Sequence, residues 1–250
     1  MAGHSQFKNI MYRKGAQDKL RAKIFSRLAR EITVAVKTGG ADAASNPRLR
    51  LAIQNARSEN MPKDNIERAI AKGSQTNDTS NYEEVRYEGF GPGSVAIIVE
   101  ALTDNRARTA PAVRSYFAKN GGNMGETGSV TFNFERIGFI EYPLSVATPD
   151  AMFETALEAG ASDVETTEDK HEITCTPDDL AAVRDALEAK FGTANVARLD
   201  WKPLVETPIT DLETAQKFVK FLSVFDEDDD VQRVIHNADI PDDIAAKLEG

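Results

Sequence analysis

The spacing of apolar residues changes from a helical to a strand-like pattern near residue 80, and this change constrains the fold more than any other feature. Before that point, apolar residues such as Leu20, Ile24 and Leu28 follow one another every three or four positions, which is typical of one buried helix face. After it, short apolar runs alternate with helical stretches, as in domains that pack helices on sheets. The polar run 74–81 between the two patterns predicts a linker.

The same boundary separates two opposite charges. The first 75 residues contain 15 Lys and Arg against 6 Asp and Glu, about +9, whereas the remaining 175 contain 15 against 34, about −19. The whole chain averages to a formal charge of −10 and a pI near 4.9. A solvated basic helix face is the simpler interpretation for a single helix, but here the bias covers a whole predicted domain. Such a domain most often binds a nucleic acid.

Three amphipathic helices are predicted in the basic part, and each has a recognisable start or end. Asn46–Pro47 combines an N-cap with a first-turn proline. The predicted helices run from Leu20 to Gly39–Gly40, from Asn46–Pro47 through Ala56, and from Met61–Asp64 to Gly73. Beside the apolar stripe of the first helix lies a basic ridge of Lys19, Lys23, Arg27 and Arg30. Reversing the first three to Glu is expected to weaken nucleic-acid binding and to leave stability nearly unchanged.

Strands and helices alternate after the linker. The first group is a strand–strand–helix–strand series, with predicted bounds 85–90, 94–102, 107–120 and 128–134. The second has the β-α-β-β-α-β order of the split ferredoxin-like motif, with predicted bounds 138–142, 149–159, 163–168, 171–175, 177–191 and 196–203. Thr148–Pro149 and Thr176–Pro177 each predict a helix start. A helix over 211–225 and a strand over 231–236 complete the series.

The order of these elements predicts an α+β multidomain protein with one domain inserted into another. The ferredoxin-like unit completes its own sheet, whereas the last helix and strand lack a full core and supply what the preceding group is missing. We therefore expect an N-terminal helical bundle followed by two α/β domains, the third inserted into the second. The predicted domains are 1–78, then 79–136 plus 204–250, and the insertion 137–203.

Residues that could support catalysis are sparse. His4, His171 and His236 lie far apart without a second ligand at helical spacing, so no metal site is expected. The single cysteine, Cys175, excludes an intramolecular disulfide and lies in an alternating stretch typical of a strand core. The segment 89–93 lacks the ending of a phosphate loop and is interpreted as a hairpin turn. No enzyme activity, cofactor or small-molecule substrate is predicted.

Three further segments are interpreted from their local pattern. The acidic run Asp226–Asp230 lacks the Gly and Glu of a calcium loop, so a solvated connection is favoured over a cation site. Arg106 and Arg108 stand at a strand–helix junction, where Asp104 and Asn105 can cap the helix and the arginines can meet phosphate. The loop 120–128 contains four glycines, which favours a flexible loop, with close approach of another molecule as the alternative.

The chain carries no sign of membrane insertion or secretion. No run approaches the ~18 consecutive apolar residues that a spanning helix needs, and the N-terminus lacks the apolar core of a signal peptide. A cytoplasmic protein without a membrane partner is expected.

Several motifs distributed over residues 1–240 resemble the YebC/PmpR family. They are Met1–Ile10 followed by Arg13-Lys14, Asn46–Arg50, Asn60–Arg68, Tyr87–Gly93, Leu102–Arg106, Lys119–Gly122 and His236-Asn237. Phe7 stands where the family usually has Trp and Tyr12 where it often has His; both keep a ring for stacking. The resemblance implies an N-terminal helical domain followed by two α/β domains.

The resemblance also implies a gene-expression regulator without a catalytic reaction. DNA-binding transcriptional regulation is the primary hypothesis. The alternative is a translation factor on the ribosome, since ribosomal RNA offers phosphates together with exposed bases for stacking. An enzyme acting on nucleic acid is the least favoured class. The residues predicted to bind nucleic acid are His4, Ser5, Phe7, Lys8, Tyr12, Arg13, Lys14, Lys19, Arg21, Lys23, Arg27, Arg48, Arg50, Lys63, Arg106 and Arg108.

Overall fold

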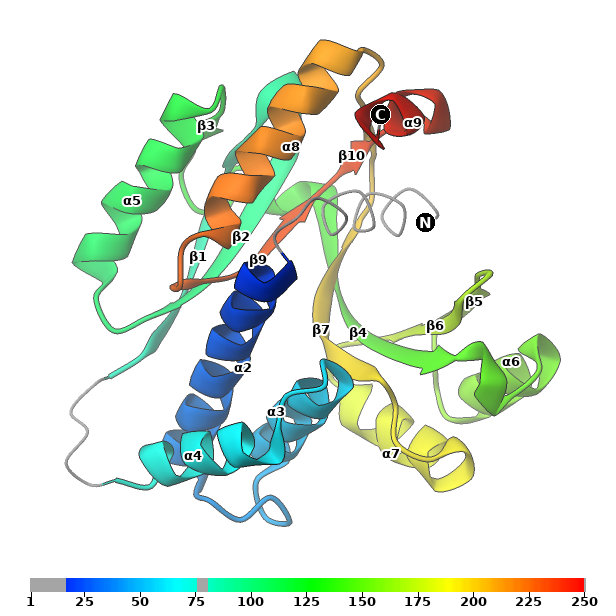
Figure 1. Cartoon of the computed structure of the whole chain (residues 1–250). Coiled ribbons are helices and arrows are strands. Elements are labelled where there is room, and N and C mark those ends of the chain that lie inside the picture. The colour runs from blue at the N-terminus through cyan, green and yellow to red at the C-terminus, as the bar shows by residue number, and fades with distance from the viewer. Residues whose placement is uncertain (1–16, 76–80, 250) are drawn as a thin grey trace. The chain divides into compact units, whose positions relative to one another are not determined.

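The computed structural model describes residues 17–75 and 81–249, apart from the side chains of 17–20 and 249 (Figure 1). The chain forms two compact units. Of the described residues, one unit contains 17–27, 81–135 and 203–249, and the other contains 28–75 and 136–202. Helices and antiparallel sheets occur in both α/β parts, so the predicted α+β multidomain class is confirmed.

The described residues before the linker form three successive helices: α2 (Gln17–Gly39), α3 (Pro47–Ser58) and α4 (Lys63–Gly73). Asn46 caps α3 as predicted, because its side-chain oxygen accepts a hydrogen bond from the N–H of Leu49 at 3.0 Å. Its amide nitrogen donates to the carbonyls of Ala35 and Gly40, both at 2.8 Å. One buried side chain therefore joins the end of α2 to the start of α3.

The first compact unit is built on a sheet of order β3-β1-β2-β9, formed by Asn123–Met124, Glu83–Phe90, Ala96–Thr103 and Val231–His236. Helices α5 (Arg106–Lys119) and α8 (Leu212–Asp226) lie side by side over it (Figure 1). Phe117 of α5 packs edge-on against Phe221 and Phe225 of α8, with ring centroids 5.3 and 5.5 Å apart. These buried rings stabilise the unit largely through apolar burial.

Short elements complete this unit. Strands β8 (Thr207–Pro208) and β10 (Ala238–Asp239) pair in parallel, and helix α9 (Asp242–Glu249) follows. The turn between β1 and β2 contains the short 3₁₀ helix η1 (Pro92–Ser94), and Gly93 there has a φ of 76°, a conformation that favours glycine. The segment 89–93 is thus part of a hairpin connection, as expected.

The second compact unit contains a sheet of order β5-β6-β4-β7, formed by Asp163–Thr166, Lys170–Cys175, Phe134–Pro143 and Val196–Pro203. This order and the intervening helices α6 (Pro149–Glu158) and α7 (Leu180–Phe191) are those of the split βαβ motif. The core includes Ile140, Tyr142 and Met152, and Leu51 of α3 packs against it. The side-chain amide of Gln54 donates to the carbonyl of Ala194 at 2.7 Å. Helix α3 therefore packs within this unit.

Two local predictions are wrong. The segment 128–133 is not a strand; it leads into the 3₁₀ helix η2 (Thr131–Asn133). The backbone N–H groups of Val130 and Thr131 donate to the buried carboxylate of Glu88 at 3.0 and 3.1 Å, so they are not available to a ladder. Helix α7 begins at Leu180 rather than 177, because Thr176 and Asp179 form a turn first. Helix α9 and the short strands β3 and β10 were not anticipated.

Candidate nucleic-acid interface

Half of the predicted binding residues lie at the start of the chain. Those outside the described residues are His4, Ser5, Phe7, Lys8, Tyr12, Arg13 and Lys14. Lys19 lies in α2, but its side chain is not described. The structure therefore bears on the remaining cations of α2, α3, α4 and α5.

The cations in the first turns of α2 differ in their surroundings. Arg21 is exposed, with its guanidinium carbon 5.5 Å from the centre of the Phe25 ring. Lys23 instead forms an ion pair with Asp229, Nζ to Oδ1 at 2.5 Å, and also donates to the carbonyl of Glu227 at 3.0 Å. One turn further on, Arg27 contacts Asp226, Nη1 to Oδ1 at 3.3 Å. Two of the three ridge positions considered for charge reversal therefore already bind carboxylates.

These contacts correct the interpretation of the acidic run as a solvated connection. The segment Asp226–Asp230, here called the acidic segment, joins α8 to β9 and contacts two helices. Burial raises the pKa of Asp226 above its ordinary value, although the Arg27 guanidinium acts in the opposite direction. At the other end of the segment, Asp230 is almost fully buried. The segment therefore organises neighbouring side chains instead of only facing water.

Arg108 is bound by this acidic segment from the other side. Its Nη2 donates to Asp230 Oδ2 at 2.7 Å and to Asp104 Oδ1 at 3.0 Å. Asp230 also accepts hydrogen bonds from the hydroxyls of Thr103 and Thr109, at 3.1 and 2.7 Å. The hydrogen bond from Arg108 to Asp230, followed by the charge of that carboxylate, raises the pKa of Arg108. The geometry gives Arg108 a clear role in joining α5 to the start of β9.

Arg106 has no such partner among the described residues. It is exposed in the first turn of α5, and Asn105 caps the helix by accepting a hydrogen bond from the N–H of Arg108 at 3.0 Å. Helix α5 carries four cations and no Asp or Glu. Within the part of the chain that the structure describes, no hydrogen bond or ion pair is made by the side chains of Arg106, Arg114 or Lys119. Arg114 and Lys119 were missed by the sequence analysis because neither was recognised as part of a binding motif.

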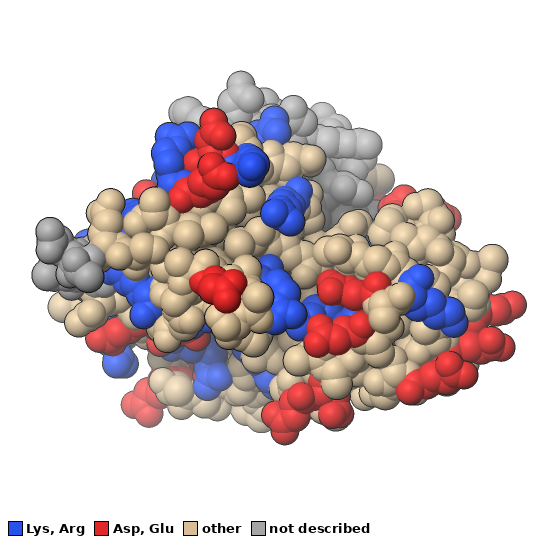
Figure 2. Space-filling model, turned by 90° about the horizontal axis from the view of Figure 1, so that it is seen from below, with Lys and Arg blue, Asp and Glu red and all other residues tan. Residues whose placement is uncertain are grey.

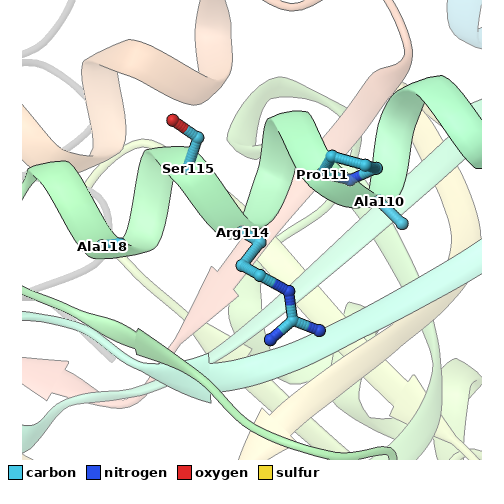
Figure 3. A pocket seen from close by; sticks show the side chains of 5 residues that line it. All are labelled: Ala110, Pro111, Arg114, Ser115 and Ala118. Carbon is cyan, nitrogen blue, oxygen red and sulfur yellow. The ribbon is translucent and has the colours of Figure 1, made fainter.

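A surface hollow of about 500 Å³ lies against the outer side of α5. The described residues that line it are Ala110, Pro111, Arg114, Ser115 and Ala118 (Figure 3). Figure 3 shows the Arg114 side chain extended away from the helix, on the opposite side from Ser115 in that view. Small side chains around one extended guanidinium allow another molecule to approach the helix backbone closely. The described lining of the hollow therefore contains one cation and no carboxylate.

The cations of α3 and α4 form a second described set. Arg48 is paired with Glu31, with Nη2 2.9 Å from Oε1, and so has a local structural contact. Arg50 is exposed and donates to the carbonyl of Ala43 at 3.3 Å. Lys63 is highly exposed and lies 3.5 Å from Glu67, one turn along α4. Exposed pairs of this kind exchange readily with solvent or a ligand.

Two further exposed cations of these helices were not predicted. Arg57 at the end of α3 and Lys72 at the end of α4 have no ion pair to another described residue. Figure 2 shows one face of the molecule, on which Lys and Arg side chains are interspersed with Asp and Glu rather than forming one continuous basic area. Formal charge along the chain is therefore a poor guide to which cations are available.

The glycine-rich loop after α5 is held at several points. Gly122 and Gly125 donate backbone hydrogen bonds to the carbonyls of Phe117 and Glu88, both at 2.9 Å. A Cβ at Gly122 would lie 2.6 Å from the carbonyl oxygen of Phe90, so no larger residue fits without movement. Burial by itself raises the pKa of Glu88, but hydrogen bonds from residues 128–131 outweigh it and bring the pKa below its ordinary value. These contacts explain at least Gly122 by packing.

The side chains of His171 and Cys175, considered above for metal binding and catalysis, are both buried. His171 is buried between the Thr166 hydroxyl at 2.8 Å and the Ala147 carbonyl at 3.1 Å. Burial raises the pKa of the Cys175 thiol to about 11, which keeps it protonated at neutral pH. Within the described ranges, no group of three or more His, Cys, Asp and Glu side chains is arranged to hold a metal ion. Nor does any described helix have the length and apolarity needed to cross a membrane.

The fold and the exposed cations define a class: a multidomain α+β protein with a basic helical N-terminal part. The comparisons with known proteins identify the family. A family model described as the TACO1/YebC protein N-terminal domain matches residues 5–76, and one described as the TACO1/YebC second and third domain matches residues 82–238. The chain belongs to the TACO1/YebC family, and the second model carries a transcription-regulator name.

A solved structure supports the same assignment. The conserved hypothetical protein Aq1575 from Aquifex aeolicus is 47% identical in sequence and superposes with a TM-score of 0.79. The match covers 89% of this chain and 91% of that protein.

Proposed function

We propose that this protein is a non-enzymatic, cytoplasmic, nucleic-acid-binding regulator of gene expression, and that DNA is its target in a transcriptional role. The observation that carries the proposal is the net charge of about +9 on the first 75 residues of a chain whose remainder is acidic. Exposed Arg21, Arg50, Lys63, Arg57 and Lys72 on the described helices supply phosphate contacts. The family-model name agrees with this role.

Ribosomal RNA is the second candidate target, in a translation factor that binds the ribosome. The observation in its favour is that Phe7 and Tyr12 supply rings within the basic N-terminal segment. Aromatic rings stack on unpaired bases, which ribosomal RNA presents and duplex DNA does not. The residues His4, Ser5, Lys8, Arg13, Lys14 and Lys19 remain part of the proposed contact surface for either target.

We further propose that α5 supplies a second contact to the same nucleic acid. Arg106 and Arg114 are eight residues apart, so they stand about 12 Å apart along the helix axis and are turned by about 80° about it. That spacing and the small residues between them suit an extended phosphate backbone. Arg108 takes part only indirectly, because its guanidinium is held by Asp230 and Asp104. The 175 residues after residue 75 carry a net charge of about −19, so without such a contact a polyanion would repel them.

The target is tested by crosslinking the full-length protein to nucleic acid in cells and sequencing what is recovered. Enrichment of promoter DNA supports the transcriptional role, and enrichment of ribosomal RNA selects the translational one. Recovery of neither above the level of a non-binding control protein would overturn the proposed function.

The α5 contact is tested with the triple variant R106A/R114A/K119A. A matched control, K217A/K220A/K247A, removes three exposed cations from the same compact unit. We expect weaker binding of labelled duplex DNA than in the control, and a salt dependence shallower by about 0.9 in log–log slope for each phosphate that the variant no longer binds. Equal affinities and slopes for the two variants would show that α5 does not touch the nucleic acid.

A further inference from the structure

The acidic segment touches the basic surface of α2 directly. Five consecutive acidic residues, Asp226–Asp230, begin at the last residue of α8, and two of them bind cations of α2 that lie one turn apart. Asp229 pairs with Lys23 and Asp226 with Arg27, although about 200 positions separate the partners in the sequence. Backbone carbonyls of residues 225–227 accept further hydrogen bonds from the same two cations. The contact therefore consists of several ion pairs and hydrogen bonds rather than of a single interaction.

These groups offer the same chemistry as a nucleic-acid backbone. A carboxylate and a phosphate both present anionic oxygens to Lys ammonium and Arg guanidinium groups, at similar hydrogen-bond lengths. The Nζ of Lys23 and the Nη atoms of Arg27 already point at acceptors of the protein. The same N–H groups cannot donate fully to a phosphate while they hold these contacts. Nucleic acid and the acidic segment must therefore compete for Lys23 and Arg27.

The contact is also weak enough to be exchanged. The side chains of Lys23 and Asp229 keep 36% and 54% of their exposure, and ion pairs with this access to water contribute little to stability. The Arg27–Asp226 pair is less exposed, at 15% and 35%, but its 3.3 Å distance is longer than that of a strong charge-assisted hydrogen bond. Two other members of the acidic segment are held elsewhere: Asp228 by the hydroxyl of Tyr116 and Asp230 by Arg108. Opening the α2 contact thus leaves the attachment to α5 in place.

We propose that Asp226 and Asp229 form an intramolecular competitor that occupies the phosphate-binding groups of α2 until nucleic acid displaces it. This inference rests on the proposed function, because it takes a nucleic-acid backbone to be the ligand of Lys23 and Arg27. The competitor lowers affinity for any polyanion and raises the number of simultaneous phosphate contacts needed to displace it. It thereby determines which polyanions this surface accepts.

The test compares the double variant D226N/D229N with the control E154Q/E158Q in the full-length protein. The control makes the same change in net charge at two exposed positions of α6, in the other compact unit. The probes are a labelled 30-base-pair duplex DNA of mixed sequence and a labelled fragment of ribosomal RNA, each titrated at several salt concentrations. We expect D226N/D229N to bind at least one probe about fivefold more tightly than the control, most clearly at low salt.

A third variant separates failure of this inference from failure of the proposed function. K23A/R27A removes the cations themselves and is expected to weaken binding of the same probe. If K23A/R27A weakens binding while D226N/D229N binds no better than E154Q/E158Q, the competitor does not exist and the proposed function stands. If K23A/R27A binds the probes as tightly as wild type does, the α2 surface does not contact nucleic acid. Both the competitor and the proposed role of α2 in nucleic-acid binding are then wrong. If circular dichroism shows that D226N/D229N does not fold, the binding affinity of the single variant D229N is compared with that of the single control E154Q. Equal affinities would then contradict the competitor.

Discussion

Helices α2 and α5 are both basic and both contact the acidic segment, but they leave different cations available. On α2, the described cations Lys23 and Arg27 are engaged by Asp229 and Asp226. On α5, Arg108 is engaged by Asp230, whereas Arg114 on the outer side has no described ion-pair partner. The comparison teaches that a local excess of Lys and Arg does not define a binding surface by itself. The binding surface is defined by the Lys and Arg side chains that do not already form ion pairs with carboxylates of the protein.

The two contacts also differ in burial, which makes them different in energy. Asp230 is only 6% exposed and receives three side-chain hydrogen bonds, so it resembles a core network. Of the α2 contacts, Lys23–Asp229 remains accessible to water and resembles an ordinary surface ion pair, whereas Arg27 and Asp226 keep only 15% and 35% of their side-chain exposure. We therefore expect the α5 contact to contribute to folding and the α2 contact to contribute mainly to ligand competition.

The sharpest way to break this comparison is to remove Asp230. The substitution Asp230→Ala leaves the Thr103 and Thr109 hydroxyls without their buried acceptor and Arg108 without its closest carboxylate. We expect the free energy of unfolding to fall by about 3 kcal/mol, measured by urea denaturation. Asp243→Asn, an exposed change on α9, is the control and should stay within about 0.5 kcal/mol of wild type. A D230A protein as stable as that control would contradict the network's role.

A medium effect is expected when the α2 cations are reversed. In K23E/R27E, two new carboxylates face Asp229 and Asp226, so attraction is replaced by repulsion. We expect a loss of about 1–2 kcal/mol in thermal or urea unfolding. This differs from the expectation drawn from the apolar stripe alone, which was that reversing these positions leaves stability nearly unchanged. The control R57E/K72E changes the charge equally at exposed sites, and equal losses in both variants would argue against specific α2 contacts.

The smallest effect concerns the pH dependence of Asp226. Because burial holds its pKa above the ordinary value in the folded state, the folded protein binds this proton more readily than the unfolded chain. Its contribution to stability is therefore fully present below the unfolded pKa and is lost as the pH rises through the folded pKa. Relative to D226N, wild type should gain stability as the pH falls from 7 toward 4, by less than about 1 kcal/mol. Parallel pH profiles for the two proteins would show that Asp226 does not titrate differently on folding.

The domain boundaries at about 78, 136 and 203 remain a proposal with a direct test. The first compact unit unites 79–135 with 203–250, and the βαββαβ segment lies between them in the sequence. Deleting 138–203 with a short linker is expected to leave a folded remainder, whereas removing 204–250 takes away α8 and β9 and should unfold the sheet they complete.

Much of the fold was determined by local sequence. The apolar stripe of α2, the Asn46 cap of α3 and the Thr148 cap of α6 act within a few residues, so periodicity and capping chemistry suffice to predict them. The order of the βαββαβ elements could likewise be predicted, because apolar residues recur with one period in strands and another in helices. The charge asymmetry and the family motifs needed no structure at all.

Only the tertiary structure decided which charged groups meet. Lys23 finds Asp229 across 206 positions, and the N–H groups of Val130 and Thr131 bind Glu88 instead of forming a strand. No local pattern distinguishes Arg108, which is held by a buried carboxylate, from Arg106, which is exposed two residues earlier. The physical reason is that hydrogen bonds and ion pairs between distant segments depend on where the chain brings those segments, whereas helix periods and caps depend only on near neighbours.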